Sequence, residues 1–199
     1  MAFILAHKEV PRSRKILYIV FILGSIPLIY LFGFCGMRFF LVPSKSMEPG
    51  ILPSDRIITL QNDTYERGDV VVITDPFAPD EYLVKRIVGI GGDLLEVKGG
   101  ALFINGLYAS EPYRYEFIDY QMEPYRVKPG DVFVLGDHSN WSVDSHNWNA
   151  SQQDSNSDRK ATPSGISEST IIGQVRYCYW PIKRIQSIKP YPLSNIQGD

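Results

Sequence analysis

Residues 82–90 read Tyr82-Leu83-Val84-Lys85-Arg86-Ile87-Val88-Gly89-Ile90, a run in which apolar and β-branched residues surround two adjacent basic residues. This composition predicts a β-strand. Side chains alternate between the two faces of a strand, so Lys85 and Arg86 point in opposite directions. One of them can turn inward while the other stays in solvent. The alternative is an edge strand on which both charges are exposed.

Further short strand signals lie on both sides of this run. The turns between them carry glycine and asparagine: Gly99-Gly100 joins two of the strands as a hairpin, and Asn105-Gly106 is a strong tight-turn signal. Many short strands with little helix predict a mainly β, barrel-like domain of short antiparallel strands. The expected strands are residues 56–60, 69–74, 94–97, 101–104, 131–135 and 171–180, and residues 112–129 are expected to form a loop or an irregular strand pair.

The N-terminal part of the chain has a different composition. Residues 1–15 hold four basic residues and one acidic residue, and residues 16–37 hold no charge. A helix over 16–37 reaches roughly 30 Å, enough to cross a bilayer. A cleaved signal peptide is the alternative, but its apolar core is shorter. We therefore predict a cytoplasmic tail (1–15), a transmembrane anchor (16–37) and an extracytoplasmic β-rich domain (38–199).

Composition excludes several other classes. The net charge of the 199 residues is −2, which gives no reason to expect a nucleic-acid partner. The three histidines, at positions 7, 138 and 146, show no metal-ligand spacing, and the two cysteines define neither a disulfide scaffold nor a metal site. We expect no metal and no cofactor. Residues 147–169 are rich in Ser, Asn, Asp and Gln, which predicts a solvated, flexible loop.

A candidate nucleophile lies just after the apolar run, in Pro43-Ser44-Lys45-Ser46-Met47-Glu48-Pro49-Gly50. A serine hydroxyl needs a neighbouring base to take its proton. His138 and His146 are possible bases. A lysine is a base only if its pKa falls from about 10.4 toward 7–8, which burial in apolar surroundings achieves. Lys85, within its apolar strand, suits that role.

Four motifs in one order carry a family resemblance. Residues 44–49 (SKSMEP), 68–72 (GDVVV), 85–93 (KRIVGIGGD) and 136–145 (GDHSNWSVDS) follow one another behind the apolar run. The sequence resembles the type I signal peptidases, membrane-bound Ser–Lys proteases that remove signal peptides from exported proteins. The resemblance covers residues 39–188 and the preceding anchor.

The resemblance implies a role for individual residues. It makes Ser46 the nucleophile and Lys85 the general base, with an oxyanion hole formed by the Ser46 backbone N–H and the Ser44 hydroxyl. Ser142 corresponds to the serine that orients the lysine amine, and Asp144 to the acidic residue that braces its loop. Plain turn chemistry is the alternative for these last two residues.

The resemblance also implies a substrate. An extended peptide would lie between the chain on either side of the dyad. Shallow apolar pockets would accept small side chains at the −1 and −3 positions, as in Ala-x-Ala sites. The implied pocket residues are Phe40, Val42, Met47, Ile51, Leu83 and Val84.

The chain departs from the family pattern at several positions. Gly50 stands where threonine is usual, Gly91 where proline is usual, and His138 where asparagine is often found. His146 stands where an arginine would pair with Asp144. We expect His146 to do so only when protonated, which predicts a looser loop or activity that depends on pH.

These expectations describe a single-pass endopeptidase of the bacterial cytoplasmic membrane, whose partners are signal-peptide-bearing preproteins and membrane lipid. Enzymes of the endoplasmic reticulum have histidine in place of Lys85, so an organellar enzyme is the lesser alternative to a bacterial one. A conjugation-type pilin-processing peptidase would share the dyad. A soluble self-cleaving repressor and a non-catalytic membrane-surface protein are more distant alternatives.

Overall fold

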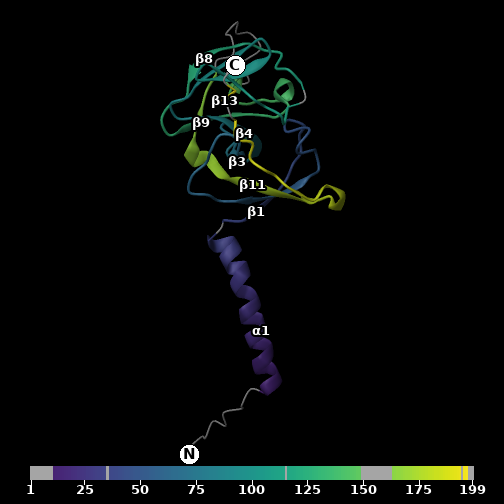
Figure 1. The fold of residues 1–199 in the computed structure, drawn as a ribbon. Coiled ribbons are helices and arrows are strands. Elements are labelled where there is room, and N and C mark those ends of the chain that lie inside the picture. Colours follow the sequence, from purple (N-terminus) through teal and green to yellow (C-terminus); the bar gives the residue numbers. More distant parts are fainter. Residues whose placement is uncertain (1–10, 35, 115, 149–162, 194, 197–199) are drawn as a thin grey trace, which may run out of the picture. The chain divides into compact units, whose positions relative to one another are not determined.

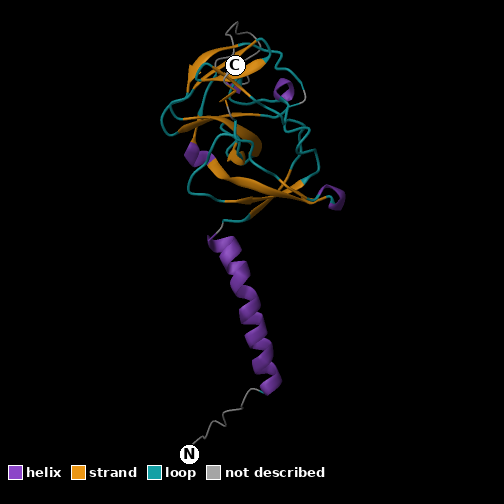
Figure 2. Cartoon of the chain, viewed as in Figure 1, coloured by secondary structure: helices purple, strands orange, loops and turns teal. Residues whose placement is uncertain are grey.

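The structure, a computed structural model, describes residues 11–34, 36–114, 116–148, 163–193 and 195–196 (Figure 1). These residues belong to two units, residues 1–36 and residues 37–199, and each is described by itself. The first unit is helical, and the second consists of strands and connecting loops with three short 3₁₀ turns (Figure 2).

The helix of the first unit, α1 (Arg12–Ile29), differs from the predicted 16–37 at both ends. It begins before the apolar run and takes in three basic residues. It gives way to a π-helical segment, η1 (Tyr30–Phe34), three residues after Pro27, which lacks an N–H for the helix ladder. No side chain described in α1 is buried. Over the described part of the chain, we find no helix that is both long and apolar enough to span a membrane.

The larger sheet of the second unit holds eight antiparallel strands. Its hydrogen-bonded order is β1 (Arg38–Leu41), β2 (Arg56–Leu60), β11 (Ile171–Trp180), β3 (Val70–Thr74), β4 (Tyr82–Ile90), β9 (Asp131–Leu135) and β10 (Ile166–Ser167), and β12 (Gln186–Ser187) also pairs with β11. Among the described strands, this order forms an open path from β1 to β10 rather than a closed barrel. The three 3₁₀ turns are η2 (Ser139–Trp141), η3 (Glu168–Thr170) and η4 (Ile182–Arg184).

The smaller sheet holds five antiparallel strands, in the order β13 (Asn195–Ile196), β7 (Leu107–Ala109), β6 (Ala101–Ile104), β5 (Leu94–Lys98) and β8 (Met122–Arg126). Its two tight turns were predicted from sequence. Asn105 and Gly106 have φ values of 55° and 82°, and Gly99 and Gly100 have φ values of 58° and 80°. Such left-handed pairs match the right-handed twist of the flanking strands.

The prediction of a mainly β domain of short antiparallel strands is confirmed. Strand β4 has the predicted bounds, and so do β2, β6, β9 and β11. Strands β1 and β7 were not anticipated, because each is too short to show an alternating pattern. Residues 149–162 of the predicted flexible loop lie outside the described residues, and the end of that loop forms β10 and η3.

Apolar packing on both faces of the central strands holds the larger sheet together. Val71 and Ile73 of β3 and Ile87 of β4 are fully buried in one cluster. A second cluster, on the side of the candidate nucleophile, contains Val42, Met47 and several strand residues. Burial of such side chains contributes roughly 1.5–3 kcal/mol each. The apolar contacts of this second cluster thus hold the chain between β1 and β2 against the sheet.

Candidate active site

Ser46 lies on a compact turn between β1 and β2, which we call the nucleophile turn (residues 43–55). Backbone hydrogen bonds close it: Val42 N–H donates to the Asp55 carbonyl at 2.9 Å, and Ile51 N–H donates to the Met47 carbonyl at 3.0 Å. Met47 and Ile51 are 1% and 2% exposed within the core. Ser46 is also buried (7% exposed), so its hydroxyl is held in a fixed position.

The Ser44 hydroxyl lies beside the Ser46 hydroxyl, with their oxygens 3.3 Å apart. Either oxygen can be the donor in this contact. The turn therefore brings together the two residues that were expected to form the oxyanion hole. A hydroxyl this close to the nucleophile can donate to an oxygen that becomes negatively charged there.

Lys85 lies in the middle of β4 and is 3% exposed. Its Nζ donates to Ser142 Oγ at 2.9 Å. Burial lowers the pKa of the Lys85 amine, although the charges of Asp144 and Asp75 oppose the shift. An amine with a lowered pKa is more readily neutral, and only a neutral amine can accept a proton.

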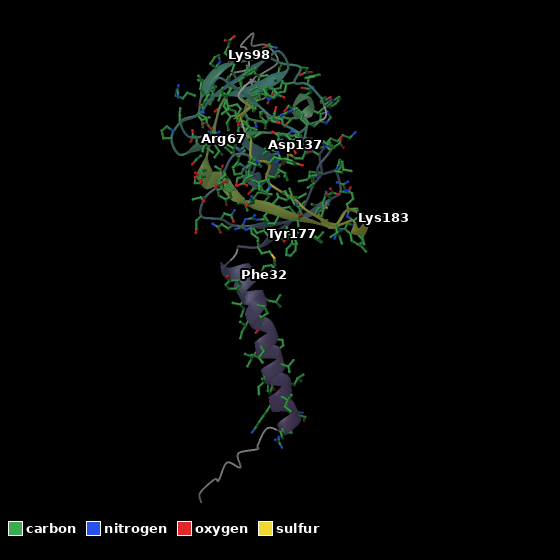
Figure 3. All side chains as sticks on the ribbon, in the orientation of Figure 1. Phe32, Arg67, Lys98, Asp137, Tyr177 and Lys183 are labelled. Carbon is green, nitrogen blue, oxygen red and sulfur yellow. The ribbon has the colours of Figure 1, made fainter. Side chains whose placement is uncertain are left out.

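Arg86 points to the other face of β4, as predicted, but it does not stay in solvent. It is 4% exposed and donates to both carboxylate oxygens of Asp137, at 2.8 and 2.7 Å. Its guanidinium also lies 4.0 Å from the centre of the Tyr113 ring. Sequence reasoning missed this pair, because nothing local shows that Tyr113 covers this face. Asp137 lies inside the β-rich unit (Figure 3).

The loop after β9 joins the two halves of the site. His138 N–H donates to the Ser46 carbonyl at 3.0 Å. Gly136 N–H donates to Asp144 Oδ2 at 2.9 Å. A Cβ on Gly136 would lie 2.4 Å from the Ser46 carbonyl oxygen and 2.5 Å from Ser142 Oγ. Gly136 is therefore the contact point between the nucleophile turn and the lysine's hydrogen-bond partner.

One cavity of about 370 Å³ contains both candidate catalytic groups. Its apolar lining comes from β1, the two residues that follow it, β3 and β4, and Asp80 and Glu81 also line it. Of the predicted pocket residues, Met47 and Ile51 lie in the core and are not among the described residues that line this cavity. Neither are His138 and His146. The predicted site residues that do line it are Phe40, Val42, Ser44, Ser46, Leu83, Val84 and Lys85.

Comparison with known proteins identifies the family. The family model described as signal peptidase, peptidase S26, matches residues 13–180.

The chain belongs to the signal peptidase family, peptidase S26.

Its relatives in this family come from chloroplasts and bacteria. Signal peptidase I of Leptolyngbya laminosa is 31% identical over 167 residues, which are 76% of this chain and 72% of the relative. Thylakoidal processing peptidase 1 of Arabidopsis thaliana is 31% identical over 158 residues. This chain spans 42% of that relative and 39% of the probable thylakoidal processing peptidase 2. A crystal structure of a signal peptidase I from Enterococcus faecalis is 21% identical, with a TM-score of 0.42, and the match covers 56% of this chain and 97% of that one.

Two departures from the signal peptidase pattern have defined contacts. His146 Nδ1 lies 2.6 Å from Asp144 Oδ1, and its ring stacks on Tyr120 with centroids 3.8 Å apart. A neutral imidazole protonated at Nδ1 can make this contact, so the pairing does not require a charged histidine. His138 Nε2 lies 2.9 Å from Glu116 Oε1. Both histidine side chains thus lie beside carboxylates.

No group of three or more His, Cys, Asp or Glu side chains among the described residues is arranged to hold a metal ion. The polar groups of the cavity are hydroxyls, one amine and two carboxylates. The chemistry available from these side chains is nucleophilic attack by a hydroxyl and proton transfer to an amine.

Proposed function

We propose that this chain is a membrane-anchored serine endopeptidase that removes N-terminal signal peptides from exported preproteins. The observation that carries the proposal is one cavity lined by Ser46 and by a buried lysine, Lys85. Burial lowers the pKa of that lysine, as a general base requires. Membership of the signal peptidase family supports the same activity.

In the proposed mechanism, neutral Lys85 takes the Ser46 hydroxyl proton as the serine oxygen attacks the scissile carbonyl carbon. The carbonyl oxygen becomes negative and accepts hydrogen bonds from the Ser46 N–H and the Ser44 hydroxyl. The protonated lysine then donates its proton to the leaving amine. In the second half, Lys85 takes a proton from a water molecule as the water oxygen attacks the ester carbon. Lys85 then gives that proton to the Ser46 oxygen as the ester bond breaks. Ser142 keeps the amine in place through the 2.9 Å hydrogen bond.

The cavity walls support a preference for small side chains. Phe40, Val42, Leu83 and Val84 line the space beside the dyad, and a peptide that extends along β4 would place alternate side chains against them. We propose that Ala-x-Ala sites fit these walls. Met47 and Ile51 would contribute indirectly, because their packing in the core fixes the turn on which Ser46 lies.

We also propose that the uncharged residues 16–37 anchor the chain in a bacterial cytoplasmic membrane, with the basic residues before them on the cytoplasmic side. Fractionation of cells that express the full chain tests this. We expect the protein to resist alkaline carbonate and to be released by detergent. Release by carbonate alone would contradict anchoring.

The decisive experiment is cleavage of a preprotein with an Ala-x-Ala site by the purified full chain in detergent. We expect Ser46→Ala and Lys85→Ala to lose at least about a thousandfold in rate while they stay folded. Lys98→Ala is the matched control, because Lys98 is an exposed lysine that pairs with Glu96. Activity in Lys85→Ala would mean that another group is the base, and His138 and His146 would be tested next. A wild type that is inactive on all such substrates would refute the proposal, and a pilin-type substrate would be tested next.

A further inference from the structure

The chain after β11 lies beyond the residues that match the family model. We call residues 181–193 the C-terminal segment. It contains η4 and β12 and passes close to the nucleophile turn. We propose that Arg184 and Gln186 of this segment are positioning residues that hold the Ser46 turn through the carbonyl of Gly50. This inference builds on the proposed function and adds residues outside the four motifs that carry the family resemblance.

Arg184 joins the last residue of the nucleophile turn, Asp55, to Gly50 in its middle. Its Nε donates to Asp55 Oδ1 at 2.9 Å, and its Nη2 donates to Asp55 Oδ2 at 3.0 Å. The same Nη2 donates to the Gly50 carbonyl at 3.2 Å. The Asp55 side chain is 1% exposed and the Arg184 side chain is 28% exposed, so the carboxylate is shielded from water while the guanidinium is partly solvated.

Gln186 provides a second donor to the same carbonyl, since its Nε2 lies 3.2 Å from the Gly50 oxygen. Two side chains from outside the turn therefore converge on one backbone oxygen within it. Because the C-terminal segment is distant in sequence, this contact limits movements of the turn that its own internal hydrogen bonds would allow.

Position 50 is a glycine, so no side chain restricts the backbone of the turn at this point. Glycine restricts the backbone less than any other residue. Space does not demand it here: a Cβ on Gly50 would lie 3.8 Å from Asp137 Oδ2 and 3.9 Å from the Met47 carbonyl, which are ordinary contacts. Threonine is usual at this position in the signal peptidases that the sequence resembles. The hydrogen bonds from Arg184 and Gln186 thus restrict the backbone at position 50, where a side chain would otherwise do so.

A direct path connects Gly50 to the reacting hydroxyl. Ile51 N–H, which follows Gly50, donates to the Met47 carbonyl at 3.0 Å, and Met47 follows Ser46. A displacement of Gly50 would therefore shift the peptide units next to the nucleophile. Misplacing a catalytic group by about 1 Å can cost about 100-fold in rate.

The C-terminal segment has other attachments, so removal of Arg184 should leave it in place. Tyr191 N–H donates to the Gly68 carbonyl at 3.3 Å, and Leu193 is buried in the core. The variants below therefore test the hold on the turn rather than the presence of the segment.

The kinetic test compares Arg184→Ala, Gln186→Ala and Lys183→Ala in the full chain. We expect Arg184→Ala to lower kcat about 10- to 100-fold while KM changes less than about threefold, with a smaller loss for Gln186→Ala. Lys183→Ala is the matched control, because this neighbouring basic residue is exposed on the same turn (Figure 3). Introducing Gly50→Thr should reduce the loss caused by Arg184→Ala, a rescue that a general stability defect does not predict.

A second readout does not depend on peptidase activity. Hydrogen exchange at the Ile51 amide should accelerate about tenfold in Arg184→Ala and stay unchanged in Lys183→Ala. If the wild type cleaves no peptide but exchange changes in this way, the hold on the turn stands and the proposed function fails. Wild-type kcat and wild-type exchange in Arg184→Ala would overturn the inference, whatever the substrate.

Discussion

At the scale of single residues, the site depends on an amine held where its charge is costly. Lys85 is surrounded by strand residues, and Ser142 accepts its hydrogen bond. Asp144, Asp75 and Asp137 favour the charged form, but desolvation outweighs them and lowers the pKa. A buried lysine that is neutral in the folded state and protonated in the unfolded chain lowers the free energy of unfolding at neutral pH. The burial that lowers the pKa of Lys85 therefore has a cost in stability.

Lys85→Met should abolish cleavage and raise the free energy of unfolding at pH 7 by about 1–3 kcal/mol. Between the lowered pKa and the unfolded value of about 10.4, the unfolded chain binds more protons than the folded one. Wild-type stability therefore rises with pH through this window, and the advantage of Lys85→Met should shrink toward pH 10. Chemical denaturation at several pH values measures this effect. A variant less stable than wild type at pH 7 would contradict it, with Lys98→Met as the control.

At the scale of elements, the site lies where three pieces of backbone meet: the nucleophile turn, strand β4 and the loop that follows β9. The pairing of β4 with β9 places Arg86 opposite Leu135, so the loop begins beside the two basic residues. The His138 N–H bond to the Ser46 carbonyl then ties the loop to the turn. Close approach at Gly136 leaves no room for a side chain.

Gly136→Ala should separate the turn from Ser142, because the new methyl would meet the Ser46 carbonyl oxygen at 2.4 Å. We expect a loss of about 1–3 kcal/mol in unfolding free energy and a fall of at least about 100-fold in kcat. Gly24→Ala is the control, since a Cβ there would meet nothing within 4 Å. Thermal unfolding and single-turnover kinetics give the two values. Near-wild-type kcat in Gly136→Ala would show that the contact does not position the site.

At the scale of the whole β-rich unit, the C-terminal end of the chain links the two sheets. Strand β12 pairs with β11 in the larger sheet, and β13 pairs with β7 in the smaller one. Between them, the backbone of Tyr191 passes directly over Gly68, whose carbonyl also accepts a hydrogen bond from Arg86 at 2.7 Å. Strands β12 and β13 and the Tyr191 backbone thus contact both sheets and the Gly68 carbonyl, which Arg86 also reaches.

Gly68→Ala tests this link. Gly68 has a φ of 93°, and its Cβ would meet the Tyr191 backbone. Gly92 has a φ of 98° with nothing within 4 Å, so Gly92→Ala carries the same backbone strain without the clash. We expect Gly68→Ala to lose about 1–3 kcal/mol more than Gly92→Ala in unfolding free energy. We also expect faster proteolysis after residue 180. Equal losses would mean that the C-terminal segment is not held at Gly68.

The local sequence pattern was enough to predict the β-rich class, most strand bounds, both tight turns of the smaller sheet and the family. These features could be predicted because alternation, turn residues and motif order are all visible along the chain. The pattern did not show that Arg86 is buried, that Ile51 belongs to the core, or that Arg184 and Gln186 reach Gly50. Each of those facts joins residues that are far apart in sequence, or concerns a face covered by a distant segment. Such contacts arise only when the sheets pack, because burial depends on what covers a strand and not on the strand's own residues.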